Sequence, residues 1–165
     1  MLKRATMQER TSIAAQAARD IEAWLRNKKI TVDVVNVEDD RKYQSADIDL
    51  VWKTTLGEKT IEIKGDTYHQ TGNFFLETYS NRELNTPGCF LYTEADFIYY
   101  YFVGIKKLYI LPMPETREWF LKHPDEFSEK ATQTIIGNES RYTTVGRLVP
   151  IKILMQNISV KVYQL

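Results

Sequence analysis

Residues 45–66 read SADIDLVWKTTLGEKTIEIKGD, and this stretch decides which fold the sequence predicts. Residues 48–54 and 59–64 alternate apolar and polar side chains and are rich in β-branched types, a pattern typical of half-buried strands. The residues between them, 55–58, include Gly57. We therefore expect a β-hairpin with a four-residue loop at 55–58.

The position of this loop predicts how the two strands pair. The opposed pairs would be Asp49 with Lys64, Val51 with Glu62, Lys53 with Thr60, and Asp47 with Asp66. One face of the hairpin then carries Asp47, Asp49, Lys53, Glu62, Lys64 and Asp66, and the other carries Ile48, Leu50, Trp52, Ile61 and Ile63. A slip of one residue would move half of the polar set into the core, so we expect the pattern to specify the register.

The polar face of this hairpin combines carboxylates with a lysine. Two neighbouring carboxylates repel each other unless a cation lies between them. Oxygen ligands favour a hard ion such as Mg²⁺, and a lysine beside that ion could stabilise the anionic transition state of phosphodiester cleavage. The alternative is a solvent-exposed strand face with cross-strand ion pairs, which is common on hairpins.

The same residues resemble a known family. An aspartate that enters a strand, a short turn and then Glu62-Ile63-Lys64 in a hydrophobic strand are similar to the PD-(D/E)XK nuclease superfamily, over about residues 7–80. The resemblance implies a restriction-endonuclease-like α/β fold, with a central mixed β-sheet flanked by helices. It also implies a metal-dependent phosphodiesterase in which Asp49 and Glu62 bind the metal, the Ile63 carbonyl is a further ligand and Lys64 is the catalytic lysine.

The sequence departs from the family pattern just before the aspartate. The expected proline is replaced by Ile48, and Asp47 is a second candidate for the first acidic position. We expect Asp49 to be the ligand because it directly enters the apolar run that follows, and because the predicted register places it opposite Lys64.

The rest of the chain predicts a mixed α and β domain. Helical spacing of apolar residues predicts helices at 7–28 and 114–122. Runs of β-branched and aromatic residues predict strands at 30–37, 73–79, 97–103, 108–111, 148–154 and 158–163, with 97–103 and 108–111 forming a second hairpin. Neither an internal repeat nor a linker composition interrupts the sequence, so we expect one domain over residues 1–165.

Accessory residues follow from the resemblance and from charge. Acidic side chains of the first helix, Asp20 foremost, and the polar residue Gln70 are candidates for accessory roles in the site. Basic residues near the C-terminus suit phosphate contacts: Arg141, Arg147 and Lys152. For each of these residues the alternative is an ordinary exposed surface position.

Composition excludes several classes of protein. The 22 basic and 22 acidic residues balance, which argues against a dedicated nucleic-acid coat, and the 43% of hydrophobic residues suffice for a core. The longest apolar run, 97–103, cannot span a membrane, and no secretory signal is recognisable, so we expect a cytoplasmic protein. The single cysteine, Cys89, excludes an internal disulfide and a zinc site built from cysteines.

These observations predict a Mg²⁺-dependent endonuclease, with Mn²⁺ as a substitute, that hydrolyses nucleic acid, DNA in preference to RNA. The alternative is a non-catalytic module on the same fold that binds DNA or another protein. Cleavage of both strands of a duplex would favour a homodimer or higher homo-oligomer, because each strand needs a site. Substrate specificity and the number of metal ions stay open.

Overall fold

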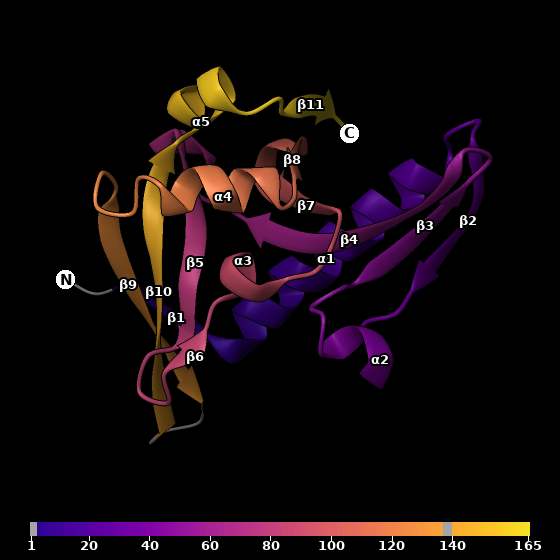
Figure 1. The fold of residues 1–165 in the computed structure, drawn as a ribbon. Coiled ribbons are helices and arrows are strands. Elements are labelled where there is room, and N and C mark those ends of the chain that lie inside the picture. Colours follow the sequence, from indigo (N-terminus) through magenta and orange to yellow (C-terminus); the bar gives the residue numbers. More distant parts are fainter. Residues whose placement is uncertain (1–2, 137–139) are drawn as a thin grey trace.

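The computed structural model describes residues 3–136 and 140–165 and has a mixed α/β architecture built on two β-sheets (Figure 1). The larger sheet has six strands in the order β11-β8-β7-β4-β3-β2. Their bounds are β2 Thr31–Asn36, β3 Leu50–Thr54, β4 Gly57–Asp66, β7 Phe97–Phe102, β8 Lys107–Pro112 and β11 Lys161–Gln164. Strands β4 and β7 run parallel and the other neighbours run antiparallel, so the sheet is mixed, as the sequence predicts.

The second sheet has five strands in the order β1-β9-β10-β5-β6. Their bounds are β1 Lys3–Thr6, β5 Asn73–Asn81, β6 Thr86–Pro87, β9 Ser128–Ile136 and β10 Ser140–Pro150. The sequence predicts β5 but not the long β9–β10 pair, whose threonines and charged residues lack a clear apolar alternation. These two strands are held mainly by their pairing with each other and with β5.

Helix α1, Met7–Arg26, lies across one face of the six-stranded sheet and is seen behind it in Figure 1. It begins with a capping box in which Thr6 and Glu9 satisfy each other's backbone N–H groups. Its fully buried residues Ala17, Ile21 and Leu25 recur at helical spacing and pack against side chains of β2, β3, β4, β7 and β8. The predicted first helix is therefore confirmed, with its end two residues earlier than expected.

The opposite face of the six-stranded sheet packs against the second sheet and the short helices. These helices are α3 Cys89–Tyr92, α4 Glu115–Leu121 and α5 Ile151–Asn157; a further one, α2 Arg41–Gln44, precedes β3. Strand β7 contributes to both cores, because Ile98, Tyr100 and Phe102 face the second sheet while Tyr99 and Tyr101 face α1. This central aromatic strand therefore holds the two layers together.

The predicted strand at 148–154 is half wrong. Leu148 is in β10, but the chain turns into α5 directly after Pro150. Ile151, Leu154 and Ile158 pack into the core between the two sheets. They are spaced three and four residues apart, which is the period of a helix rather than of a strand. The predicted strand at 158–163 begins only at Lys161, as β11. Within the described residues, the structure contains no helix that is both long enough and apolar enough to cross a bilayer.

Candidate active site

The β3–β4 hairpin pairs two residues out of the predicted register. Its loop is the dipeptide Thr55-Leu56 rather than four residues, because Thr54 pairs with Gly57, which has a φ of 126°. Leu50 lies opposite Ile61 and Lys53 opposite Glu58, so the four predicted pairs are wrong. A shift of two residues keeps every strand side chain on its predicted face, which is why the hydrophobic pattern did not exclude it.

This register brings Asp49 to Glu62 instead of Lys64. The Asp49 N–H donates to the Ile61 carbonyl at 2.9 Å, and Asp49 Oδ2 accepts from the Ile63 N–H at 2.7 Å. The Asp49 and Glu62 side chains influence each other, and this interaction lowers the pKa of Asp49 and raises that of Glu62. Burial is the main cause of the raised pKa of both groups.

Asp47 reaches the same cluster through an unusual backbone conformation. Its φ of 53° is in the left-handed region, and its carbonyl accepts a hydrogen bond from Thr93 Oγ1 at 2.8 Å. This irregular backbone also turns Ile48 to the side of Val51, not to the predicted side of Leu50. The Asp47 Oδ1 accepts from the Tyr92 hydroxyl at 3.1 Å, whereas Oδ2 is buried with no hydrogen-bond partner among the described residues.

The electrostatics of the cluster disfavour negative charge. Burial, with a contribution from Asp49 and Glu77, raises the pKa of Asp47 from its ordinary value of 3.8 to about 6. Glu62 is only 8% exposed, its Oε2 has no partner among the described residues, and its pKa is raised well above the usual range by burial and by Asp49 and Asp47. Buried carboxylate oxygens without donors cost free energy unless a proton or a cation neutralises them.

The cluster offers ligands suited to a divalent cation. One ligand atom each from Asp47, Glu62 and Cys89 lie within 4.8 Å of one another. The carboxylate oxygens suit a hard ion such as Mg²⁺ or Mn²⁺, and the two unpartnered oxygens are the structural observation that fits such an ion. The single cysteine of the sequence excludes a zinc site built from cysteines only. It does not exclude a mixed site in which the Cys89 thiol joins the carboxylates of Asp47 and Glu62. Burial raises the pKa of the Cys89 thiol well above its usual range.

Lys64 pairs with a residue from the other sheet. Its Nζ lies 3.2 Å from Oε2 of Glu77 on β5, whose side chain is 11% exposed. Burial opposes the lysine charge, but the attraction of Glu77 outweighs it and raises the pKa of Lys64. Lys64 therefore keeps its positive charge in the site. It lies near Asp47 and Glu62, whose burial disfavours their negatively charged forms.

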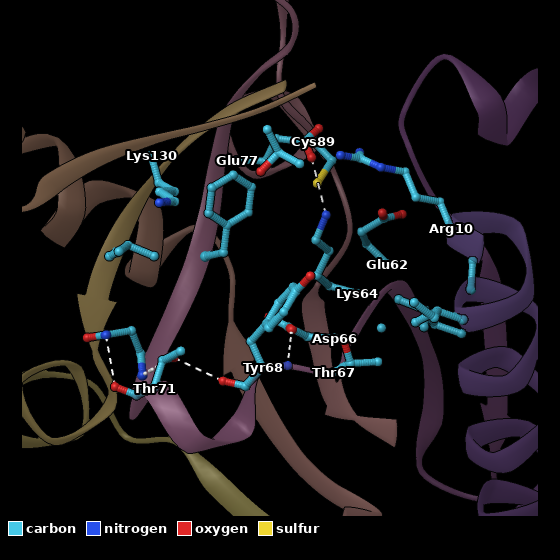
Figure 2. Close-up of a pocket in the computed structure, with 18 residues that line it drawn as sticks. Arg10, Glu62, Lys64, Asp66, Thr67, Tyr68, Thr71, Glu77, Cys89 and Lys130 are labelled. Carbon is cyan, nitrogen blue, oxygen red and sulfur yellow. Dashed lines mark hydrogen bonds and ion pairs between the residues drawn. The ribbon is translucent and has the colours of Figure 1, made fainter. Parts of the chain in front are cut away.

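Glu62, Lys64, Glu77 and Cys89 line a cavity with a volume of about 530 Å³ between α1, the end of β4 and the second sheet, whereas Asp47 and Asp49 lie behind its wall. Figure 2 shows Arg10 of α1 and Lys130 of β9 extending into the same space as Glu62, Lys64 and Glu77. The Arg10 Nη1 donates to Thr144 Oγ1 at 3.3 Å, which ties the guanidinium to β10. Two cations thus face a space whose inner wall is acidic.

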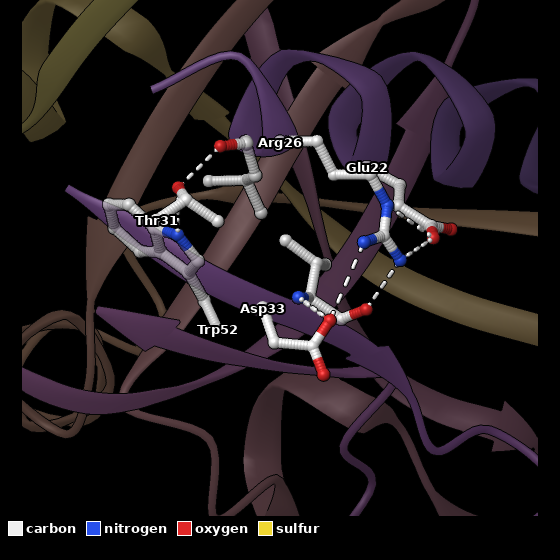
Figure 3. Close-up of polar contacts among 7 residues, drawn as sticks. Glu22, Arg26, Thr31, Asp33 and Trp52 are labelled. Carbon is white, nitrogen blue, oxygen red and sulfur yellow. Dashed lines mark hydrogen bonds and ion pairs between the residues drawn. The ribbon is translucent and has the colours of Figure 1, made fainter. Parts of the chain in front are cut away.

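The structure places the accessory candidates of the first helix outside this cavity. Asp20 accepts from the Tyr101 hydroxyl at 2.8 Å and from Gln16 at 2.7 Å, on the face of the sheet that α1 covers. Its neighbour Glu22 forms an ion pair with Arg26 at 2.7 Å, and Arg26 also donates to the Val34 carbonyl, which joins α1 to β2 (Figure 3).

The remaining candidates also lie away from the acidic cluster. Gln70 is exposed in the 3₁₀ helix His69–Thr71, of which Thr71 lines the cavity but Gln70 does not. The basic candidates near the C-terminus lie on β10 and α5, outside the residues that line the cavity: Arg141, Arg147 and Lys152. Of these, Arg147 donates to the Phe127 carbonyl at 3.0 Å and lies 3.5 Å from Glu129.

Three cavity residues carry no signal in the sequence: Arg10, Cys89 and Lys130. They are far from the hairpin in the chain, and only the packing of the two sheets brings them to it. Comparison with protein-family models, with curated proteins and with solved structures found no match to this chain.

Proposed function

We propose that the protein is a divalent-metal-dependent phosphodiesterase that hydrolyses the backbone of a nucleic acid. The observation that carries this proposal is a pair of buried carboxylate oxygens without a hydrogen-bond partner in the described part of the chain, Asp47 Oδ2 and Glu62 Oε2, beside the charged Lys64. Such a pair is unfavourable in the empty site and becomes favourable around a cation. The resemblance of Asp49 and Glu62-Ile63-Lys64 to PD-(D/E)XK nucleases supports the same reaction class.

Asp47 and Glu62 would hold the cation directly. Asp49, whose Oδ2 accepts from the Ile63 N–H at 2.7 Å, would complete the ligand set beside Glu62. The Ile63 carbonyl is a further candidate ligand from the resemblance. A bound Mg²⁺ or Mn²⁺ supplies charge neutralisation at the phosphate oxygens and a water of lowered pKa.

The cations of the cavity would act on the substrate itself. Lys64, held by Glu77 at 3.2 Å, stabilises the extra negative charge that develops on the phosphate oxygens as the bond breaks. Arg10 and Lys130 bind the flanking phosphates, because they face the same cavity from α1 and β9. We propose DNA as the polymer on the resemblance alone.

The test is cleavage of a supercoiled plasmid and of a single-stranded DNA circle with Mg²⁺, with Mn²⁺ and with a chelator. Glu62→Gln keeps the size of the side chain but removes its charge, and Lys64→Met keeps its apolar length. We expect each to reduce the rate by about a hundredfold or more. The matched control is Lys29→Ala, an exposed position in the turn that follows α1, which should cleave at the wild-type rate.

Thermal melting of each variant separates loss of chemistry from loss of fold. Absence of metal-dependent cleavage of both circles, or cleavage by Glu62→Gln at the wild-type rate, would contradict the proposal. Metal titration by calorimetry provides a second measurement, since binding that disappears in Glu62→Gln is expected even where the right substrate has not been supplied.

A further inference from the structure

The acidic cluster is recessed. Glu62 is 8% exposed and the side chain of Glu77 is 11% exposed, although both line the cavity. The cavity is bordered by α1 on one side and by β5, β9 and β10 on the other (Figure 2). Its volume of about 530 Å³ is in the range of sites that enclose one small molecule, about 300–1,000 Å³.

The depth of the cluster restricts what can reach it. Oxygen ligands bind Mg²⁺ at about 2.1 Å, so a phosphate oxygen on the same ion lies within roughly 4 Å of Glu62 Oε2. The phosphate must therefore enter the cavity. A stacked duplex holds two strands together and is too broad to follow the phosphate into a cavity of about 530 Å³. Enzymes that act on a base in a pocket meet the same restriction, and they take the nucleotide out of the helix or use a single strand.

The walls of the cavity suit an unpaired nucleotide. Phe75 of β5 lines it, with Lys64 Nζ 5.9 Å from the ring centre, and Leu148 and Ile13 add apolar surface. Tyr68, 46% exposed, extends into the same space from the end of β4 (Figure 2). Aromatic rings on which bases stack, together with cations for the backbone, are the features of single-strand binding sites.

We infer that the substrate enters as an unpaired strand (a single-stranded end, gap or flap) with a base stacked on Phe75 and its phosphate directed at the acidic cluster. This inference deepens the proposed function and rests on it for the direction of the phosphate. An intact duplex is excluded from the site because its backbone cannot reach Glu62.

The experiment measures binding separately from cleavage. Fluorescence anisotropy compares a fluorescein-labelled single-stranded oligonucleotide with a blunt hairpin duplex of the same length, in chelator and at about 0.15 M salt to limit non-specific phosphate contacts. We expect the single strand to bind at least tenfold more tightly. Phe75→Leu, which removes the ring but keeps an apolar side chain, should weaken that binding roughly tenfold.

Two further variants keep the experiment interpretable. Tyr79→Leu removes an aromatic ring from the same strand but outside the cavity, and should change the affinity less than twofold. Tyr68→Leu removes a ring that is 46% exposed and therefore less involved in the core, so it tests the aromatic wall even where Phe75→Leu fails to fold.

Equal affinity for strand and duplex, no binding of either, or wild-type affinity in both cavity variants would overturn the inference. Metal-dependent cutting of intact duplex without single-strand preference would overturn it while leaving the proposed function in place. Single-strand binding that depends on Phe75, without cleavage in any metal, would support it and overturn the proposed function instead.

Discussion

Replacing Asp47 by Asn should stabilise the metal-free protein at alkaline pH. The native pKa of about 6 lies above the unfolded value of 3.8, so the folded state holds the proton more tightly. The stability contributed by that proton is present below about pH 4 and is lost as the pH rises through 6. Two pKa units correspond to about 3 kcal/mol, which we reduce to about 1–2 kcal/mol because the carboxyl is partly accessible to solvent.

Asn is the suitable replacement for two structural reasons. It tolerates the left-handed backbone at φ 53°, and its amide oxygen can still accept from the Tyr92 hydroxyl. At pH 8 in chelator we expect Asp47→Asn to melt about 2–8 °C above the wild type, and at pH 4 to melt at about the same temperature. The exposed Asp125→Asn serves as the control and should melt at the wild-type temperature at both pH values.

The same melts in Mn²⁺ or Mg²⁺ test the site as a cation site. Ligand at a hundredfold excess over its Kd stabilises a protein by about 2.7 kcal/mol, so the wild type at pH 8 should gain on addition of metal and overtake Asp47→Asn. The reasoning would be refuted by a variant that melts below the wild type in chelator at pH 8, or by an equal metal-induced shift in both proteins.

Three further experiments test the surroundings of the site. Lys64→Met and Glu77→Gln should each destabilise the protein, with a coupling of about 1–3 kcal/mol in a double-mutant cycle by urea unfolding; independent effects would show that the ion pair is not a unit. Gly88→Ala should cost about 2–4 kcal/mol, because a Cβ there would lie 2.3 Å from the Glu77 carbonyl oxygen, whereas Gly104→Ala meets no atom within 4 Å and should stay within about 0.5 kcal/mol. The raised pKa of the half-buried Cys89 keeps its thiol protonated, so at pH 7.5 a disulfide reagent should react at under about a tenth of the rate seen in urea; an equal rate would show that the fold does not protect the thiol.

The hairpin shows what pattern alone can and cannot specify. Alternation in β4 correctly placed Glu62 and Lys64 on one face, since a strand has a period of two. The loop length was wrong by two residues, and alternation is insensitive to a shift of two. Asp49 was therefore predicted beside Lys64, whereas the structure places it beside Glu62 and adds Asp47 to the same cluster through a left-handed residue that no periodicity predicts.

The sequence by itself determined the mixed α and β character, the first helix, the aromatic hairpin of β7 and β8, and the polar face that carries Glu62 and Lys64. These features depend on local periodicity and turn chemistry, which a few neighbouring residues express. Only the tertiary structure decided that Glu77 pairs with Lys64 and that Cys89 joins the carboxylates. Both depend on contacts between β5, α3 and β4, including the close approach of Gly88 to the Glu77 backbone, and such contacts between distant segments leave no periodic trace in the chain.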